Sequence, residues 1–376
     1  MRLRLSSLVG SPLSVPLVDP FVIASARVEV TRAALVEVVL VDEEGGQAAR
    51  GLGEAAALPP VTGEDQPDIL AAVQALGEQV IGASFQGNFE EIGALLAALD
   101  DHPVARSGVE AAILDAAARL AGQPLFRWLA GHQGPLEPRL TSDITVPIHA
   151  PAYMGTLAAQ WRALGFRCFK VKVGLDAAQD LEGLAAMRQA VPDARFRLDA
   201  NGGFRAEAAI ALYQAAIAQG LLIECFEQPC ARDDLAGMAE VTRSLPVPVI
   251  ADESVRSLAD LERLATARAA SGVNLKLGKM GGLGQALAIG RRAAELGLAR
   301  MIGGMVETRL GMTTAAHVAV ALGGVELVDL DTAWLLREDP FVGGYEAAGP
   351  EYRLPEALGL GVARREAASA LSGSAP

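Results

Sequence analysis

Ionisable residues end six short apolar runs in the second half of the chain, and their types suit metal-assisted proton transfer. Carboxylates end three consecutive runs, at Asp199, Glu227 and Asp252. Parallel strands in a barrel present their carboxyl ends on one rim, so three like charges would meet there and need a cation. Ligation by oxygen alone favours Mg2+, or Mn2+ in its place, over zinc. The alternative interpretation is that each carboxylate caps the helix after its strand.

Lysines end two further runs, at Lys172 and Lys276, and Lys170 lies two residues before the first of them. In an eight-stranded barrel these runs would be the second and sixth strands, which lie opposite each other. The two amines would then flank the carbon next to the metal-bound group of a substrate. The lysine that takes a proton must be neutral, and nearby cations such as Lys170 and the metal would lower its pKa. A single strand-end lysine could instead be a solvated rim charge or the partner of a carboxylate.

These groups together predict inversion at a carbon acid. A metal-chelated carboxylate stabilises the enediolate that forms when its α-proton is lost. One lysine would remove the proton and the other would return it on the far face, which gives racemisation or epimerisation. Asp329 and Asp331 end the last run two residues apart, so their side chains share a face and suggest a site for a cationic group. Helix capping or an ion pair with an arginine is the alternative for that pair.

Positioning these residues requires a parallel (β/α)8 barrel of the TIM type. Apolar runs begin near residues 140, 168, 195, 223, 248, 273, 299 and 325, and a helical pattern follows each. This spacing is that of one βα unit. An open doubly wound sheet is the alternative. Its only candidate phosphate loop, Gly282-Leu283-Gly284, lacks a third glycine at the required offset and follows the sixth run rather than the first.

A stretch rich in Gly, Pro and His near residues 131–139 separates the barrel from an N-terminal α+β domain. Alternating apolar residues over 17–58, with a turn at 43–46, predict an antiparallel meander. Apolar residues at three-and-four spacing predict helices over 67–82, 88–99 and 103–130. We therefore expect an α+β domain over residues 1–130 and a barrel over 131–350.

Composition favours an enzyme that acts on small molecules. The 376 residues include 32 basic and 45 acidic side chains, a formal charge of −13, which argues against nucleic-acid and anionic membrane partners. Apolar residues make up 51% of the chain, enough for a large core. Three isolated cysteines fit a reducing compartment. Polar residues interrupt the apolar start, and no apolar run approaches the roughly 20 residues of a membrane span. We expect a cytoplasmic protein.

The motifs around these residues resemble those of the enolase superfamily, in its muconate-lactonizing subgroup, and most closely those of the dipeptide epimerases. The matching segments are Lys170-Val-Lys172, Asp199-Ala-Asn201-Gly-Gly, Glu227-Gln-Pro, Asp252-Glu253-Ser, Asn274-Leu-Lys276 followed by Lys279-Met-Gly-Gly, and Met305-Val-Glu307. Asp329-Leu-Asp331 matches the Asp-x-Asp motif that distinguishes dipeptide epimerases from their relatives. In those enzymes it holds the N-terminal ammonium of the substrate.

The resemblance implies roles for individual residues. It makes Asp199, Glu227 and Asp252 the Mg2+ ligands, makes Lys172 and Lys276 the acid/base pair, and gives Lys170 the role of supporting the enolate electrostatically. It also implies a modified, enolase-like barrel, with the N-terminal domain and a C-terminal segment over 351–376 capping its mouth and reading the substrate side chains. The site residues expected to contact substrate are Asp329, Asp331, Glu307, Asn201, Met305, Arg27 and Asp143. The expected reaction inverts the C-terminal residue of an L,L-dipeptide, and we expect a homo-oligomer.

The sequence says less about which substrate side chains the enzyme would prefer. The candidate cap loops span residues 21–32 and 51–65, and the first carries Arg27, Glu29 and Arg32, a mixture of signs that does not identify the arginine used by Ala-Glu epimerases. Asp143, expected near the end of the first barrel strand, would favour a cationic side chain.

Other activities of the same superfamily are the alternatives. They are an N-acylamino acid racemase and a lyase of the o-succinylbenzoate synthase or sugar-acid dehydratase type. Asp329 and Asp331 argue against both, because they would repel an acyl group or a second carboxylate. A non-catalytic dipeptide-binding barrel would have no use for opposed lysines. The mandelate-racemase branch needs a strand-end histidine, and none of the four histidines ends a late run.

Overall fold

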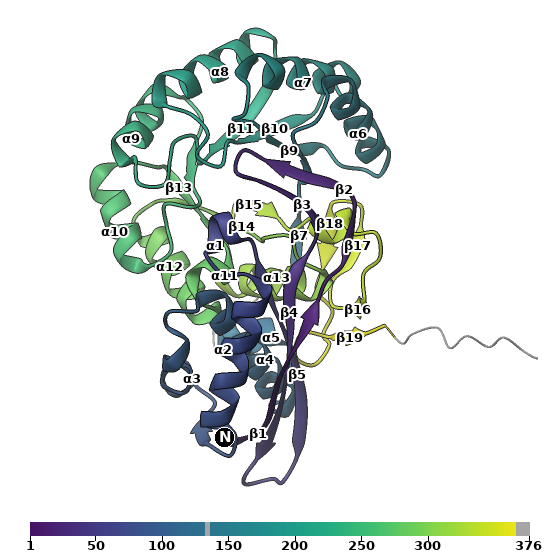
Figure 1. Ribbon diagram of the computed structural model, residues 1–376, viewed down its shortest axis with the longest axis vertical. Helices are drawn as coiled ribbons and strands as arrows, with labels where there is room; N and C mark the ends of the chain where they lie inside the picture. The colour runs from purple at the N-terminus through teal and green to yellow at the C-terminus, as the bar shows by residue number, and fades with distance from the viewer. Residues whose placement is uncertain (132–135, 366–376) are drawn as a thin grey trace, which may run out of the picture.

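The computed structural model describes residues 1–131 and 136–365, and a parallel barrel forms its larger part (Figure 1). Part of the predicted domain boundary and the end of the predicted C-terminal segment lie outside the described residues. The barrel strands are β8 (Ile144–Val146), β9 (Cys168–Lys172), β10 (Arg195–Asp199), β11 (Leu222–Glu227), β12 (Val249–Ala251), β13 (Gly272–Leu275), β14 (Ala299–Gly303) and β15 (Leu327–Asp329), hydrogen-bonded in this order. Beside β8, the backbone N–H of Asp143 donates to the carbonyl oxygen of Val328 in β15 at 3.1 Å, which brings the two ends of the sheet together.

Helices return the chain between successive strands, so the predicted barrel fold is confirmed. They are α6 (Pro151–Ala163), α7 (Ala177–Ala190), α8 (Ala206–Ala218), α9 (Leu235–Ser244), α10 (Leu258–Ala267), α11 (Leu277–Met280), α12 (Leu283–Glu295) and α13 (Arg309–Leu322). After β15 the only helix of the described residues is a 3-10 helix, η2 (Thr332–Leu335). The eighth unit is therefore shorter than the other seven. No helix within the described ranges has both the length and the apolar character needed to cross a membrane.

The first barrel strand starts later than the sequence pattern predicts. The run near residue 140 forms β7 (Arg139–Thr141), which pairs with β18 (Glu351–Arg353) rather than with the barrel. Both end residues of β7 are exposed, whereas all three residues of β8 are buried, as a strand with neighbours on both faces requires. Asp143 therefore precedes the first barrel strand instead of ending it, and its predicted position was wrong.

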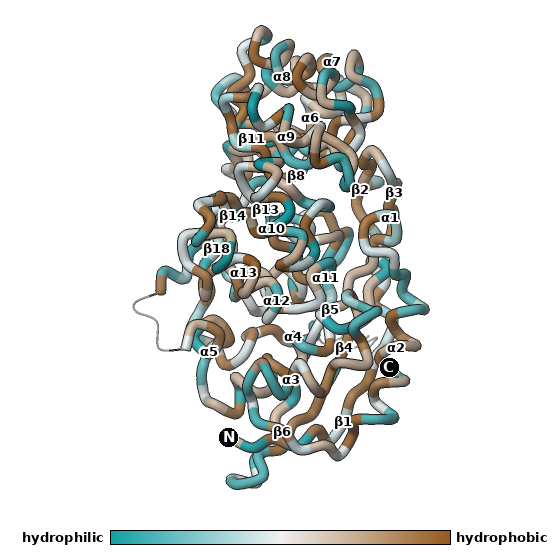
Figure 2. Tube along the Cα trace, turned by 90° about the vertical axis from the view of Figure 1, so that its left-hand side faces the viewer, coloured by the Kyte–Doolittle hydropathy of each residue, from teal (hydrophilic) through white to brown (hydrophobic). Residues whose placement is uncertain are grey.

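The N-terminal domain is an antiparallel sheet packed against helices. Its strands are β1 (Arg2–Leu13), β4 (Arg32–Asp42), β5 (Ala48–Ala57) and β6 (Ser84–Gln86), in the order β5-β4-β1-β6, and a hairpin of β2 (Pro16–Ile23) and β3 (Ala26–Val30) extends to the barrel mouth (Figure 1). Apolar residues recur along β1 and β4, as Figure 2 shows. The predicted meander over 17–58 omitted β1, which lies at the centre of this sheet.

The described part of the cap also contains five α-helices and one short 3-10 helix. They are α1 (Pro59–Thr62), α2 (Gln66–Val80), α3 (Phe89–Leu95), η1 (Ala97–Leu99), α4 (Pro103–Leu120) and α5 (Leu125–Ala130), and strand β6 lies between α2 and α3 in the chain. The helix predicted over 103–130 is thus two helices, with Gly122 between them at a φ of +69°. Only glycine adopts this left-handed conformation without steric cost, so the chain turns there.

The C-terminal residues return to the cap helices. Strand β16 (Phe341–Gly343) pairs with β19 (Val362–Arg364), and β17 (Glu346–Ala348) pairs with β18. The buried Asp115 carboxylate in α4 accepts hydrogen bonds from the backbone N–H of Leu360 at 2.6 Å and of Leu52 at 3.0 Å. One side chain therefore ties the C-terminal segment, a cap helix and strand β5 together.

Strand β5 and helix α4 are in backbone contact. A Cβ added at Gly53 would lie 2.0 Å from the carbonyl oxygen of Gly108, and one at Gly51 would lie 2.0 Å from that of Ala112. These distances are far below van der Waals contact. Strand β5 and helix α4 can therefore approach this closely only because glycine has no Cβ atom. Larger residues at either position would separate the helix from the sheet.

A buried carboxylate connects the cap to the barrel. Glu54 of β5 accepts hydrogen bonds from the backbone N–H groups of Thr308 at 3.0 Å and Gly311 at 2.9 Å, at the start of α13. Burial raises the pKa of Glu54 to about 8, with a further contribution from the charge of Glu307, although the hydrogen bonds oppose this. The helix amides thus hold a group whose ionised form is costly to bury.

We predict that Gly53→Ala destabilises the protein by about 1–3 kcal/mol or more, because overpacking forces backbone shifts. Thermal or denaturant unfolding measures this. Gly77→Ala in α2 is the matched control, since its added Cβ would meet nothing closer than 3.7 Å. Equal stabilities of the two variants would show that the β5–α4 contact does not need glycine.

We predict that Glu54→Gln changes how stability depends on pH. The folded-state pKa of about 8 lies above the ordinary value of 4.5, so the wild-type protein loses stability as pH rises between these values. Glutamine does not titrate, so the stability of the variant relative to wild type should increase between pH 5 and pH 8.5 by more than about 1 kcal/mol. Melting temperatures across this range measure it, with Glu44→Gln in an exposed turn as the control. A constant difference would contradict the raised pKa.

Candidate functional site

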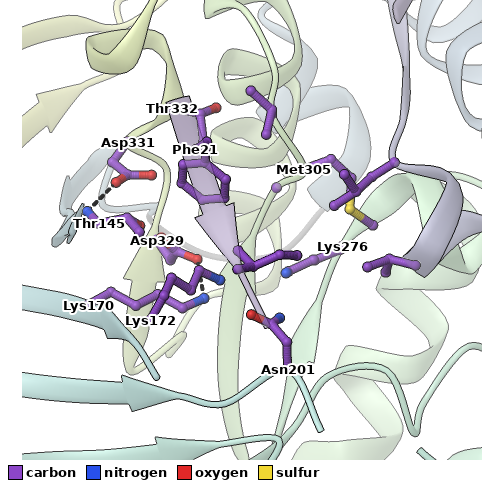
Figure 3. A pocket seen from close by; sticks show the side chains of 15 residues that line it. Phe21, Thr145, Lys170, Lys172, Asn201, Lys276, Met305, Asp329, Asp331 and Thr332 are labelled. Carbon is purple, nitrogen blue, oxygen red and sulfur yellow. Dashed lines mark hydrogen bonds and ion pairs between the residues drawn. The ribbon is translucent and has the colours of Figure 1, made fainter. Parts of the chain in front are cut away.

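A small cavity lies at the carboxyl ends of the barrel strands, beneath the cap (Figure 3). Its volume is about 30 Å³. The barrel contributes mainly polar walls, and the cap contributes an apolar one. The lining residues from the barrel include Thr145, Lys170, Lys172, Asn201, Lys276, Met305, Asp329 and Asp331, and those from the cap are Phe21, Ile23, Leu58 and Val61.

Lys172 and Lys276 enter this cavity from opposite sides of the barrel. Lys172 ends β9 and Lys276 follows β13, and three strands separate these two in the eight-stranded ring. Figure 3 shows the two ammonium groups directed into the same space from different directions. The ring of Phe21 lies over the Lys172 ammonium, 5.7 Å from the ring centroid to Nζ. The two amines are thus placed to reach both faces of a molecule held between them.

The three predicted metal ligands are fully buried and each contacts an ammonium group. Lys172 Nζ lies 2.5 Å from Asp199, and Lys276 Nζ lies 2.7 Å from Asp252. Lys170 Nζ lies 2.7 Å from Glu227 Oε2 and 3.1 Å from Asp199 Oδ2. Among the described residues, the one group of three whose acidic ligand atoms lie within 4.8 Å of one another is instead Asp143, Asp329 and Asp331. Lysine ammonium groups lie between the predicted ligands.

The donor set at the ends of β10, β11 and β12 nevertheless fits a hard divalent cation. Buried oxygens remain without hydrogen-bond partners beside the three carboxylates, at Asn201 Oδ1 and Glu253 Oε2. Buried carboxylates around the cavity also outnumber the cationic side chains. The carboxylates are Asp143, Asp199, Glu227, Asp252, Glu253, Asp329 and Asp331, and the cationic groups are Lys170, Lys172, Arg197, Lys276 and Lys279. A bound cation would favour the ionised forms of these carboxyl groups.

The pKa of Lys276 differs from the sequence-based expectation. Burial acts to lower it, but the charge of Asp252 and of other carboxylates outweighs burial, so the net pKa is raised above its ordinary value. For Asp252, burial acts to raise the pKa, and Lys276 and Lys279 reverse this to a value well below the usual range. The sequence led us to expect that neighbouring cations lower the pKa of this lysine. In the structure Lys276 is instead in direct contact with the Asp252 carboxylate.

Three residues that position the carboxylates received no role from the sequence. Lys279 Nζ contacts Asp252 Oδ1 at 2.5 Å, and Asn274 Nδ2 donates to Glu227 Oε1 at 2.7 Å. Gln228 Oε1 accepts from the backbone N–H of Asp252 at 2.9 Å. All three lie inside the motif segments that carried the resemblance. Lys279 follows Lys276 by three residues in a helical turn, a spacing that could have indicated it.

Asp329 and Asp331 form the wall of the cavity next to β8. Lys170 Nζ donates to Asp329 Oδ2 at 2.7 Å, and Asp331 Oδ2 accepts from the backbone N–H of Thr145. Asp331 Oδ1 is buried and has no hydrogen-bond partner. Burial, together with the charge of Asp329, raises the pKa of Asp331 to about 7. A cationic group bound beside Asp331 would lower this pKa and favour the ionised carboxylate.

Asp143 lies close to this pair but does not line the cavity. Its carboxylate is fully buried, and Oδ2 accepts from Arg197 Nη1 at 2.8 Å. Burial raises the pKa of Asp143 well above its ordinary value, and Asp329 adds to the shift. The guanidinium inside the barrel occupies the place where the predicted cationic substrate side chain would have to approach.

The charged residues of the cap lie away from the lysines. Arg27 forms an exposed ion pair with Glu29 at 2.9 Å, and both line a second cavity of about 490 Å³ beside Leu58 and Val306. Arg32 pairs with Asp65 at 2.6 Å and so joins the two predicted cap loops. Of two other residues expected to contact the substrate, one lines the central cavity and one is directed to the backbone. Met305 lines the central cavity, whereas the Glu307 carboxylate turns back and accepts from the backbone N–H of Met305 at 2.7 Å.

Comparison with known proteins assigns the family. The enolase C-terminal domain-like family matches residues 153–368. An aromatic dipeptide epimerase from Herpetosiphon aurantiacus is 37% identical over 96% of this chain and 99% of its own. An L-Ala-D/L-amino acid epimerase from Populus trichocarpa is 39% identical over 93% of this chain and 82% of its own.

A solved structure of similar fold contains ligands. The dipeptide epimerase from Enterococcus faecalis V583, in complex with Mg and the dipeptide L-Leu-L-Tyr, superposes with a TM-score of 0.86 at 31% identity, covering 96% of this chain and all of that one. With a family match over more than half of its length and relatives of this identity, the chain belongs to the enolase superfamily and is an isomerase.

Proposed function

We propose that this protein is a Mg2+-dependent dipeptide epimerase that inverts the α-carbon of the C-terminal residue of an L,L-dipeptide. The observation that carries the proposal is the pair Lys172 and Lys276, which reach one enclosed cavity from opposite sides. Inversion needs a proton donor and a proton acceptor on opposite faces of one carbon. Racemases and epimerases use such a pair, whereas a binding protein has no use for it.

Asp199, Glu227 and Asp252 would hold the metal ion. When bound, Mg2+ supplies positive charge that stabilises the negative charge developing on the substrate carboxylate as its α-proton is lost. Lys170 would support the same charge from beside the metal ligands, because its buried ammonium contacts Asp199, Glu227 and Asp329. The low polarity of the apolar cap wall strengthens these interactions.

The two lysines share the proton transfer. A neutral lysine accepts the α-proton on one face of the substrate, and the protonated lysine on the other face donates a proton from Nζ to the same carbon. Exchanging these roles gives the reverse reaction. Phe21, Ile23, Leu58 and Val61 of the cap close the cavity and exclude water from the carbanion.

Asp329 and Asp331 would fix the direction of the substrate. The N-terminal ammonium pairs with these carboxylates, where Asp331 Oδ1 lacks a partner. The substrate carboxylate then lies toward the metal ligands, and the α-carbon of the C-terminal residue lies between the lysines. The relatives named as dipeptide epimerases, from Herpetosiphon aurantiacus and Enterococcus faecalis, support this substrate class.

The cavity is smaller than a dipeptide, so binding requires the cap wall to move outward. A cavity of about 30 Å³ holds only a few water molecules. The hairpin of β2 and β3 and the segment at residues 58–61 form this wall, and an outward shift of the hairpin would have to break its bonds to the barrel, such as that from the backbone N–H of Ile148 to the carbonyl oxygen of Val22. Closure of such segments over a substrate is a common device for excluding water.

We predict that the enzyme places deuterium at the α-carbon of the C-terminal residue when it acts on L,L-dipeptides in deuterated water. Lys172→Ala and Lys276→Ala should each abolish epimerisation, by at least about 10²-fold. Each variant should still exchange the α-proton of one diastereomer, and the two should differ in which one. NMR and mass spectrometry of L,L- and L,D-isomers measure this. Epimerisation that persists in both single variants would eliminate the two-base mechanism.

We predict that Mg2+ stabilises the metal-depleted protein through Asp199, Glu227 and Asp252. At 100 times its dissociation constant a ligand adds about 2.7 kcal/mol, which a rise in melting temperature reports without any assay of activity. Asp252→Asn should reduce this rise, and Asp193→Asn, at an exposed carboxylate, should leave it unchanged. A rise of equal size in the Asp252 variant would place the ion elsewhere, with the group at Asp143, Asp329 and Asp331 as the site to test next.

A further inference from the structure

We propose that a separate aromatic cavity binds the side chain of the N-terminal residue of the dipeptide and selects aromatic or large apolar residues there. The proposal rests on the proposed function and adds the substrate class to it. The cavity lies between strand β2 of the cap, helix α6 and η2. Its volume is about 180 Å³. An apolar cavity of about 150 Å³ suffices to hold a benzene ring, so a phenyl group fits here.

The walls of this cavity are mainly aromatic and apolar, with Asp19, His149 and Gln160 as polar members of the lining. Tyr153, Leu157 and Trp161 come from α6, and Trp334 comes from η2. Trp161 and Trp334 meet edge to face with ring centroids 6.3 Å apart, and Phe166 lies 5.9 Å from each of them. Aromatic rings prefer such edge-to-face contacts with one another. An aromatic side chain that enters would extend this cluster.

Hydrogen bonds satisfy the polar atoms of two of these rings, Trp334 and Tyr153, and His149 packs against Tyr153 with ring centroids 4.3 Å apart. Trp334 Nε1 donates to Tyr352 Oη at 2.8 Å, and Tyr153 Oη donates to Asp19 Oδ2 at 2.7 Å. The second bond joins α6 to the cap strand β2 across the cavity. Because these bonds fix the rings, little conformational entropy remains to be lost when a ligand binds.

The cavity adjoins the reactive site on the side where the substrate's N-terminus would lie. Phe21 and Thr145 line both cavities. The backbone N–H of Thr145 donates to Asp331, one of the two carboxylates proposed to hold the substrate ammonium. The α-carbon next to that ammonium would therefore lie beside Thr145, with its side chain directed toward the aromatic cavity. The cavity beside Arg27 adjoins the reactive site through Leu58 and Val306 instead, on a different wall.

The test compares two substrates of equal composition, L-Phe-L-Ala and L-Ala-L-Phe, in the variant Gln160→Trp. Gln160 is exposed and lines the aromatic cavity, so tryptophan would fill the cavity without replacing a core residue. Wild type should favour L-Phe-L-Ala over L-Ala-L-Ala in kcat/KM by about 10- to 100-fold, the effect of burying one phenyl side chain. The variant should lower the ratio of L-Phe-L-Ala to L-Ala-L-Phe by a similar factor, mainly through KM.

A second variant and two controls keep the test decisive. Val18→Trp fills the same cavity from the cap side and starts from an exposed valine, so it should repeat the result. Gln179→Trp in α7 and Val9→Trp in β1 add tryptophan at exposed positions outside the cavity and should leave the ratio unchanged. The proposal would be overturned if both filling variants kept the wild-type ratio of kcat/KM for L-Phe-L-Ala to that for L-Ala-L-Phe. It would also be overturned if they lowered kcat/KM for L-Ala-L-Phe alone.

The outcomes also separate this proposal from the proposed function. If wild type exchanges no dipeptide α-proton in deuterated water, the epimerase proposal itself fails. If exchange occurs but L-Lys-L-Ala is preferred to L-Phe-L-Ala, the cavity selects a cation through Asp19, and the assignment to aromatic residues is wrong. Exchange with a preference for L-Phe-L-Ala that the filling variants remove supports both.

Discussion

The site depends on the ammonium group of Lys170, which is buried among carboxylates from three different strands. It contacts Asp199 of β10, Glu227 of β11 and Asp329 of β15 within 3.1 Å. A charge in this position is tolerated only because its partners compensate the loss of hydration, and removing one partner leaves the others uncompensated. The same contacts hold the carboxyl ends of β10, β11 and β15 at fixed distances from Lys170, and the other functional groups lie at these strand ends.

The barrel supplies the polar groups of the site, and the cap supplies its apolar wall. The barrel supplies the lysines and carboxylates from strand ends, where the backbone is fixed by neighbours on both sides. The cap supplies Phe21, Leu58 and Val61, which come from a hairpin and a connecting segment. The reactive groups thus stand at the ends of the barrel strands, and the cap covers them with apolar side chains.

Much of this arrangement follows from the sequence, because strand ends in a parallel barrel share one rim. The repeat length predicted the barrel, and the residue at the end of each run predicted which side chains would meet. The first strand was misplaced because two short runs, at residues 139–141 and 144–146, lie only two residues apart and only tertiary burial distinguishes them. The strand at Arg2–Leu13 was omitted because its exposed polar residues obscure the alternation.

Features that depend on contacts across the barrel could not be predicted in the same way. The raised pKa of Lys276 results from its contact with Asp252, a residue 24 positions away on the adjacent strand. The pairing of Asp143 with Arg197 likewise joins a residue just before β8 to one in β10. The aromatic cavity combines residues from the first, second and last thirds of the chain, and no local pattern marks it.

The link between Glu54 and the start of α13 bears on how such proteins can diverge. The backbone N–H groups of Thr308 and Gly311 belong to the barrel, and their acceptor, the Glu54 carboxylate, belongs to the cap. A chimera that combined this barrel with a foreign cap lacking an acidic residue at this point would leave a helix terminus without its acceptor. Recombination between relatives is therefore constrained at this junction, and again where β2 meets the barrel, because the backbone N–H of Ile148 donates to the carbonyl oxygen of Val22.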